Sequence, residues 1–289
     1  MIKLENITNV YPQFSSQLEN KILYTSHSED ISIAYKSTYT LKYVIEGTKH
    51  YQFNNQSIRV SKNQYLLLNN DKTIQTEAQK GTKGLSFFLS PELVNEIYSY
   101  HTRDASQEFP LEFYECAQLK SNNNIGFWLD KITNQLAQGP FVFHQKSDDL
   151  FLKLSEAIIK EQIIVDGKFI DLNIIKYNTK KELYKFISLT KEFINDNSND
   201  TISLDIISNN IGVSKYYLHR VFSKITGSTP LGYLTYTRLI KAKNKLQYSK
   251  DSIFEIAIEC GFENTSYFST VFKKNIGCSP SYYRTNSFI

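Results

Sequence analysis

Two segments near the carboxyl end repeat one pattern of residues, and no other feature constrains the fold of this chain as strongly. In each copy an isoleucine is followed by a glycine, a tyrosine, a phenylalanine, a second glycine and a proline. These positions are Ile207, Gly212, Tyr217, Phe222, Gly227 and Pro230 in the first copy, and Ile256, Gly261, Tyr267, Phe272, Gly277 and Pro280 in the second. Two copies of one supersecondary unit are the simplest explanation.

Each copy has the pattern of a helix, a tight turn and a second helix. A serine or asparagine can cap each helix, and a glycine can make the turn because it adopts a positive φ easily. The caps and turn glycines are Ser203, Gly212 and Ser214 in the first copy, and Ser252, Gly261 and Asn264 in the second. The apolar stripe of the second helix is Tyr217, Leu218, Val221, Phe222 and Ile225 in the first copy, and Tyr267 or Phe268 with Val271, Phe272 and Ile276 in the second.

The outer faces of these second helices are polar. They carry Lys215, Tyr216, His219, Arg220 and Ser223 in the first copy, and Thr265, Ser266, Ser269, Thr270 and Lys273 in the second. A helix with such a face suits the major groove of DNA, which admits one helix. Residues 231–246 have helical periodicity, and a continuous helix there would hold the two copies at a fixed separation. An ordinary helical core with a solvated basic face is the alternative.

The charge of the chain is divided unevenly. Residues 1–175 carry 17 basic and 20 acidic side chains, whereas residues 176–289 carry 16 and 9. The basic excess therefore lies in the part that holds the repeat. It is compatible with binding to phosphates, although many solvated surfaces have a similar excess.

The residues of both copies resemble the AraC/XylS-type family of transcription regulators. The second copy matches the family signature at Ile256-Ala257, Gly261-Phe262, Tyr267-Phe268, Phe272-Lys273-Lys274, Gly277, Ser279-Pro280 and Tyr283-Arg284. The first copy and the following helix match at Ser214, Tyr217-Leu218, Arg220, Phe222, Gly227, Pro230, Arg238 and Lys241-Ala242. The resemblance covers the last third of the chain, residues 180–289.

The resemblance implies two three-helix subdomains joined by a long helix, with the third and sixth helices in the major groove of double-stranded DNA. The DNA-facing residues that we expect are Lys215, Tyr216, His219 and Arg220 in the first unit, and Asn264, Thr265, Ser266, Ser269, Thr270 and Lys273 in the second. Arg220 can bond both acceptors of a guanine edge, or instead contact a phosphate or form a surface ion pair. The short hydroxyl residues of the second unit depart from many relatives and favour phosphate contacts over discrimination of bases.

Residues 1–118 have the pattern of an antiparallel sheet. Short segments rich in β-branched and aromatic residues are separated by turn signals such as Glu46-Gly47 and Asn54-Asn55. The segments are 30–35, 40–45, 50–53, 57–60, 64–68 and 84–89. A β-sandwich or small barrel is the economical fold, and the region weakly resembles the cupin-like effector domain that members of the family often carry. The whole chain is then an α+β protein with an all-α C-terminal domain.

A helical segment separates these two parts. Trp128, Leu129, Ile132 and Leu136 form one apolar stripe, and Leu150, Leu154, Ala157, Ile158, Ile164 and Val165 form another. The helical pair could close the sheet or supply a two-fold interface in a homodimer. We therefore expect three segments: a regulatory domain (1–118), a helical connector (119–175, with the connection itself at 166–180) and the DNA-binding domain (180–289).

Five aromatic residues of the predicted sheet could line a pocket for a small-molecule effector, or could fill the core. They are Tyr35, Tyr43, Tyr51, Phe53 and Tyr65. Metal-binding cupins carry a His-x-His pair with a later glutamate and histidine, whereas here His50 stands alone, so we expect no metal and no other cofactor. No nucleophile with a base and an orienting group is visible, and we expect no enzymatic activity.

The remaining features indicate a cytoplasmic protein with no membrane segment. The N-terminus shows no export signal, and no stretch approaches the roughly 18 apolar residues that a membrane span needs. Cys116, Cys260 and Cys278 lack metal-binding spacing and are expected to be buried free thiols.

Three functions remain open at this point. The first is a DNA-binding regulator, with RNA polymerase as its expected protein partner, whose N-terminal domain senses a small molecule or a partner. The second is a regulator controlled only by protein partners. The third, which the missing histidine pair disfavours, is a cupin-type enzyme fused to a DNA-binding tail. The sequence leaves open whether transcription is activated or repressed.

Overall fold

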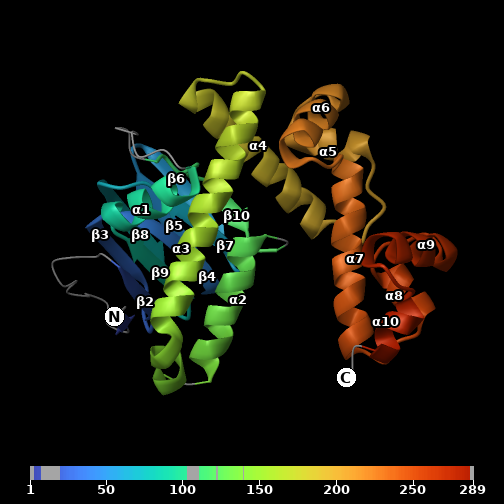
Figure 1. The fold of residues 1–289 in the computed structure, drawn as a ribbon, viewed down its shortest axis with the longest axis horizontal. Helices are drawn as coiled ribbons and strands as arrows, with labels where there is room; N and C mark the ends of the chain where they lie inside the picture. The colour runs from blue at the N-terminus through green and yellow to red at the C-terminus, as the bar shows by residue number, and fades with distance from the viewer. Residues whose placement is uncertain (1–2, 8–19, 103–110, 122, 139, 287–289) are drawn as a thin grey trace. The chain divides into compact units, whose positions relative to one another are not determined.

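The computed structural model describes residues 3–7, 20–102, 111–121, 123–138 and 140–286 of the 289-residue chain. The chain divides into two compact units, Met1–Ser188 and Leu189–Ile289 (Figure 1). Parts of the predicted sheet domain, residues 8–19 and 103–110, lie outside the described residues.

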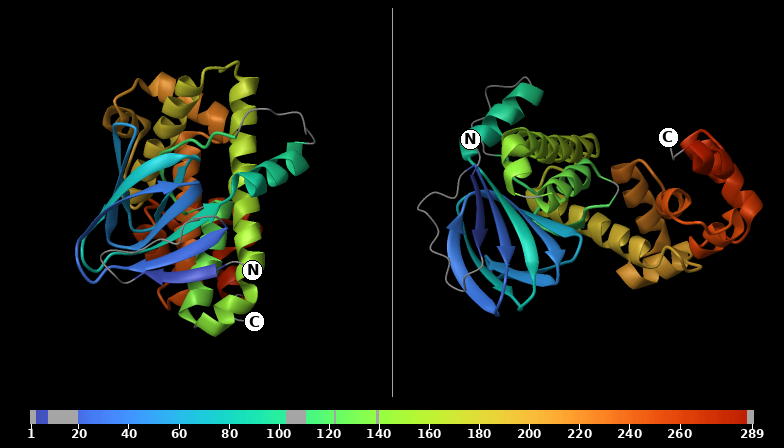
Figure 2. Two further views of the ribbon diagram at one scale, coloured as in Figure 1. Left: turned by 90° about the vertical axis from the view of Figure 1, so that its left-hand side faces the viewer. Right: turned by 90° about the horizontal axis from the view of Figure 1, so that it is seen from below.

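The first unit is a sandwich of two sheets with helices along one face (Figure 2). One sheet has the strand order β1-β2-β9-β4-β7-β10 and the other β3-β8-β5-β6. The strands are β1 (Lys3–Ile7), β2 (Lys21–Ser26), β3 (Ile31–Ser37), β4 (Tyr39–Glu46), β5 (Thr48–Phe53), β6 (Gln56–Ser61), β7 (Gln64–Leu68), β8 (Lys72–Ala78), β9 (Lys83–Leu89) and β10 (Ala117–Leu119). All pairs are antiparallel except β1 with β2.

The six strands predicted from the sequence are confirmed, each within two residues of its expected ends. Strands β1, β2, β8 and β10 and the helix α1 (Pro91–Thr102) were missed. In β8 only Ile74, Thr76 and Ala78 are buried, and polar residues stand between them. The hydrophobic signal of this strand is therefore too weak to distinguish it from a loop.

Strand β4 has both faces covered, because every residue from Tyr39 to Val44 is buried. Leu41 and Tyr43 belong to a core between their sheet and the helices α2 (Asn124–Ala137) and α3 (Pro140–Asp171). Val44 belongs instead to a second core, which lies between the two sheets. The alternation of a strand explains how one strand serves both cores.

The connector predicted at 119–175 contains the helices α2 and α3, and the structure differs from the prediction in two details. Ile164, predicted in the buried stripe, is 58% exposed, because a residue six positions after Ile158 lies on a different side of a helix. The connection is also shorter than the predicted 166–180. Helix α3 continues to Asp171, where Asn173 takes a left-handed φ of 56°, and α4 (Tyr177–Asp196) begins soon after.

Helices are the only regular elements among the described residues of the second unit, 189–286. After α4, whose residues fall in both units, it contains α5 (Leu204–Ile211), α6 (Lys215–Thr226), α7 (Pro230–Tyr248), α8 (Ile253–Glu259), α9 (Thr265–Ile276) and α10 (Pro280–Asn286). The two predicted helix-turn-helix units are α5-α6 and α8-α9, with α7 as the continuous helix between them (Figure 1). The thiols of Cys116 and Cys260 are buried and that of Cys278 is half-buried.

Candidate functional site

Helix α6 is the second helix of the first helix-turn-helix unit. Ser214 caps it as predicted, because its hydroxyl accepts a hydrogen bond from the Tyr217 amide at 3.2 Å. Leu218, Phe222 and Ile225 face the core and are buried. The preceding turn contains Gly212, whose φ of 79° lies in the left-handed region.

The outer face of α6 is exposed at every predicted DNA-facing position, which are Lys215, Tyr216, His219 and Arg220. The Arg220 guanidinium lies 5.7 Å from the centre of the Tyr216 ring, a cation–π contact that keeps both side chains on the same part of the surface. Lys215 pairs with Asp205 at 2.7 Å, but both are exposed and such a pair contributes little.

One residue expected on that outer face is placed differently. Ser223 is half-buried, and its hydroxyl is buried without a hydrogen-bond partner among the described residues. It lies one turn after His219, at the edge of the face where the helix begins to contact its neighbours. The exposed face of α6 is therefore narrower than the sequence pattern predicts.

Helix α9 is the second helix of the second unit, and Asn264 caps it through a 2.8 Å hydrogen bond from the Tyr267 amide. Ser266, Thr270 and Lys273 are exposed, whereas Thr265 and Ser269 are half-buried. The Thr270 hydroxyl donates to the Ser266 carbonyl in its own helix at 3.0 Å. This part of the face therefore presents a methyl group and a lone pair rather than a donor.

The alternative that the sequence left open in α9, Tyr267 or Phe268 in the core, is resolved. Phe268 is fully buried, whereas Tyr267 is 52% exposed. Tyr267 contributes to the wall of a hollow of about 490 Å³ between α7 and α9, together with Tyr233, Tyr236 and Lys274. Tyr267 is therefore a surface aromatic that the repeat alone could not identify.

The long helix α7 joins the two helix-turn-helix units through Arg238. Its guanidinium donates to the carbonyls of Ser198 and Asp200, both at 2.7 Å. It also lies 5.9 Å from the centre of the Phe262 ring, in the turn of the second helix-turn-helix unit. Gly261 packs against the same loop, since a Cβ there would lie 2.7 Å from the Ser198 carbonyl oxygen. These contacts hold the α8-α9 turn against the segment that precedes α5.

Four of the five aromatic residues proposed for a pocket lie in two different cores. Tyr43 and Tyr65 belong to the core between sheet and helices, and Tyr51 and Phe53 to the core between the sheets. Tyr35 is half-buried on β3. Among these five only Phe53 lines the cavity described next.

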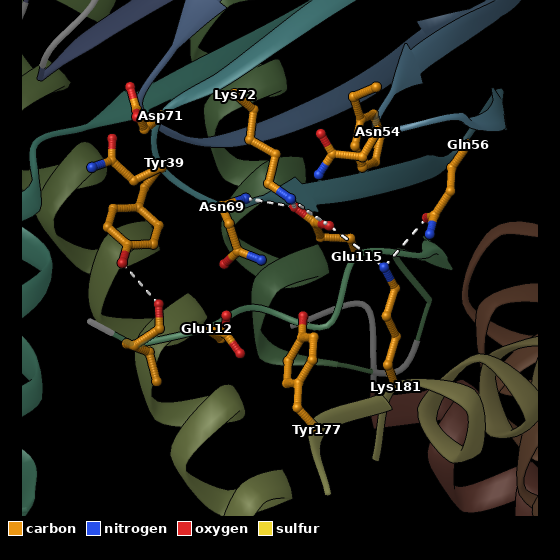
Figure 3. Close-up of a pocket in the computed structure, with 13 residues that line it drawn as sticks. Tyr39, Asn54, Gln56, Asn69, Asp71, Lys72, Glu112, Glu115, Tyr177 and Lys181 are labelled. Atoms are coloured by element: carbon orange, nitrogen blue, oxygen red, sulfur yellow. Dashed lines mark hydrogen bonds and ion pairs between the residues drawn. The ribbon is translucent and has the colours of Figure 1, made fainter. Parts of the chain in front are cut away.

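The first unit has a cavity of about 390 Å³ at one end of the sandwich, shown in Figure 3. The turns after β5 and β7, the segment 111–115 and the first turns of α4 surround it. Burial and the nearby Glu112 raise the pKa of Tyr39 in its wall to about 12. The Tyr39 hydroxyl donates to the Leu111 carbonyl at 2.8 Å.

The polar groups of this cavity already bind one another. The buried Glu115 carboxylate accepts from the Asn69 amide at 3.0 Å, pairs with Lys72 at 3.0 Å and lies 3.6 Å from the Lys181 ammonium (Figure 3). Lys181 also donates to Gln56 at 3.3 Å. This network attaches the beginning of α4 to the end of the sandwich.

Within the described ranges, no three His, Cys, Asp or Glu side chains gather closely enough to hold a metal ion. Among the same residues, no helix combines the length and the apolar character needed to cross a membrane.

The comparisons with known proteins agree with this arrangement of helices. A family model described as a helix-turn-helix domain matches residues 207–286. The transcriptional activator RhaS of Escherichia fergusonii is 32% identical over 131 residues, which are 45% of this chain and 42% of RhaS. The chain thus spans less than half the length of this relative. The Tn10 TetD protein of Escherichia coli is 37% identical over 94 residues, which are 32% of this chain and 68% of TetD.

A solved structure gives a similar match. An AraC-type transcriptional regulator from Chromobacterium violaceum is 28% identical and covers 39% of this chain and 96% of that structure, with a TM-score of 0.33. A TM-score this low establishes no common arrangement of the whole chain, and the assignment rests on the sequence matches. With the predicted motif, its helices and the coverage of TetD in agreement, the chain belongs to the AraC-type family of DNA-binding transcription regulators, a family of regulators rather than of enzymes.

Proposed function

We propose that this chain is a sequence-specific regulator of transcription that reads double-stranded DNA with α6 and α9, and whose N-terminal unit senses a small molecule or a partner. The observation that supports DNA reading most directly is the pair of capped helices with exposed polar faces in one compact unit. Arg238 and Gly261 fix the contact between their two helix-turn-helix units.

The two helices have unequal capacities for reading bases. On α6, Arg220 can reach both acceptors of a guanine edge, and its contact with Tyr216 limits the conformations that the guanidinium must lose on binding. On α9, the exposed groups are hydroxyls and Lys273. We therefore propose that α6 supplies most of the base discrimination and that α9 contributes mainly contacts with phosphates.

The relatives also support proposals for the effect on transcription and for protein partners. RhaS is named a transcriptional activator, and we extend activation, with RNA polymerase as protein partner, to this chain. Helices α2 and α3 leave Phe127 and Leu152 exposed, and these residues are available for pairing with a second chain in a homodimer.

The experiment compares two substitutions on DNA duplexes selected from a random library by the full chain. Arg220→Ala should weaken binding of the selected duplex by about 1–3 kcal/mol and relax preference at one base pair. Lys273→Ala should weaken all duplexes alike and reduce the slope of log affinity against log salt by roughly one. Lys62→Ala removes a similar charge from the first unit and should change neither.

If Arg220→Ala and Lys273→Ala both bind like the parent across the salt titration, the proposed reading faces are wrong. Sensing is tested separately, by measuring thermal unfolding with candidate small molecules. A regulator controlled only by protein partners would show no shift with any of them.

A further inference from the structure

The space between the two sheets holds two lysines. Lys42 extends from β4 and is only 1% exposed. Its ammonium lies 4.3 Å from the ring centre of Phe88 on β9 and 5.0 Å from that of Tyr35 on β3, which belongs to the other sheet. The rings of Phe88 and Tyr35 are therefore close neighbours of this cation.

Lys49 enters the same space from the opposite sheet. It lies on β5, is 4% exposed, and donates to the Thr25 hydroxyl at 2.7 Å. Thr25 is on β2, in the sheet that also contains β4. The Lys49 side chain passes Gly84 of β9, where an added Cβ would lie 3.4 Å from its terminal atoms. The missing side chain at Gly84 therefore leaves room for this lysine.

A third basic group is buried nearby. His27 follows β2, two residues after Thr25, and is 6% exposed. Both of its ring nitrogens are buried without a hydrogen-bond partner among the described residues. Burial and the neighbouring Lys49 lower the pKa of His27 to about 4.

No carboxylate compensates these groups in the described part of the chain. Lys42 and Lys49 form no ion pair there, and the acidic residues of the neighbouring strands lie outside: Glu46 pairs with Lys83 in solvent, and Glu77 binds Gln75. Burial lowers the pKa of Lys49 to about 7, and burial together with Lys49 lowers that of Lys42 well below its usual value. Unpaired buried cations are strongly unfavourable, and a bound anion would remove this penalty.

The polar groups of the cavity in Figure 3 differ in this respect, because Glu115, Lys72, Lys181 and Tyr39 already bind one another or the backbone. The residues that line that cavity attach the beginning of α4 to the sandwich. Beside Lys49, by contrast, both ring nitrogens of His27 lack a hydrogen-bond partner among the described residues.

We propose that a small carboxylate or phosphate anion binds between the two sheets, held by the ammonium groups of Lys42 and Lys49 with His27 beside them. The anion is the effector of the sensing function proposed above, and this regulatory part of the inference rests on that proposal. Thr25 is a neutral hydrogen-bonding neighbour of the same site.

The test measures thermal unfolding and titration calorimetry of the full chain with inorganic phosphate and, separately, with succinate, at constant ionic strength set by chloride. We expect one of these anions to bind and, at about 100 times its Kd, to raise the unfolding temperature of the first unit by roughly 5–10 °C. The arm that responds distinguishes phosphate from carboxylate.

Lys42→Met and Lys49→Met keep the volume of the side chain and remove the charge. Without anion each variant should unfold at the same temperature as the parent or higher, because a buried unpaired cation is removed, and each should bind the anion at least about tenfold more weakly. Lys36→Met is the matched control: Lys36 is an exposed lysine on β3, paired with Asp71 at 2.5 Å, and its loss should leave anion binding unchanged.

Absence of binding by both anions overturns the proposal, as does unchanged binding by Lys42→Met and Lys49→Met. The regulatory part is decided by DNA affinity with and without the anion that binds. A bound anion that leaves DNA affinity and transcription unchanged refutes the role as effector while leaving the site intact. Failure of DNA binding itself would show instead in Arg220→Ala and Lys273→Ala.

Discussion

Two glycines at equivalent positions of the two helix-turn-helix units offer an internal comparison. Gly212 and Gly261 both follow a short helix, and their φ values are 79° and 83°. Alanine at either position places a Cβ in the left-handed region, which destabilises the folded state by about 1–2 kcal/mol. The two sites differ in their surroundings: a Cβ at Gly212 meets nothing within 4 Å, whereas a Cβ at Gly261 lies 2.7 Å from the Ser198 carbonyl oxygen and 2.9 Å from that of Asn199.

The backbone atoms near Gly261 can move only if the contact between the two helix-turn-helix units loosens. Overpacking of this kind adds about 1–3 kcal/mol to the destabilisation. We therefore expect Gly212→Ala to destabilise the C-terminal compact unit, Leu189–Ile289, by about 1–2 kcal/mol and Gly261→Ala by about 2–5 kcal/mol. Gly261→Ala should also weaken DNA binding more than its loss of stability explains, because the spacing between α6 and α9 changes.

Urea unfolding of the full chain measures both effects. Trp128, the only tryptophan, lies in the first unit, so its fluorescence follows that unit alone. The part of the far-ultraviolet circular dichroism transition that fluorescence does not follow then reports the helical second unit. Equal losses of stability in Gly212→Ala and Gly261→Ala would refute the reasoning, since they would show that the loop at Ser198 contributes no steric restraint.

Two further predictions follow from Arg238 and from the interior lysine Lys49. Arg238→Met removes two charge-assisted hydrogen bonds to carbonyls and should destabilise the C-terminal compact unit by about 2–4 kcal/mol in the same urea experiment. The transition followed by Trp128 fluorescence should stay in place. An unchanged circular dichroism transition would contradict this prediction. The pKa of Lys49 is about 7 in the folded state and near 10.5 in the unfolded state, so in this pH range the unfolded chain binds more protons and stability rises with pH. Without anion the free energy of unfolding of the first unit should therefore increase between pH 7 and 9 by up to about 1.4 kcal/mol per pH unit, and the increase should be smaller in Lys49→Met. Parallel pH profiles of parent and variant would exclude Lys49 as its source.

The repeat made the second unit predictable because each step depended on short-range chemistry. Caps at Ser214 and Asn264, turn glycines and apolar stripes all act within a few residues of one another, and all are present as predicted. The choice between Tyr267 and Phe268 was not predictable, since both lie near the edge of one helical stripe. The positions of α7 and α8, whose Leu239 and Ile256 share a core with Phe268, determine which ring is buried.

The first unit was predictable in its strands but not in its chemistry. Lys42 stands between Leu41 and Tyr43, where alternation predicts a side chain in solvent. It is buried because a second sheet covers that face, and no local pattern shows this. Glu115 and Lys181 are likewise separated by 66 residues and meet only through the fold. Four of the five aromatic residues fill a core, which is one of the two roles that the sequence left open, but the sequence could not show that they divide between two cores.

The difference between α6 and α9 has a consequence for promoters. A protein that reads DNA with two identical helices related by a two-fold axis binds a palindromic site and has no preferred direction along the duplex. One chain of this protein carries two different exposed helix faces in a fixed order. The face of α6 presents Arg220 and Tyr216, and the face of α9 presents small hydroxyl residues. If α6 and α9 both read DNA as proposed, the target needs no symmetry, and a single bound molecule has one direction along the promoter.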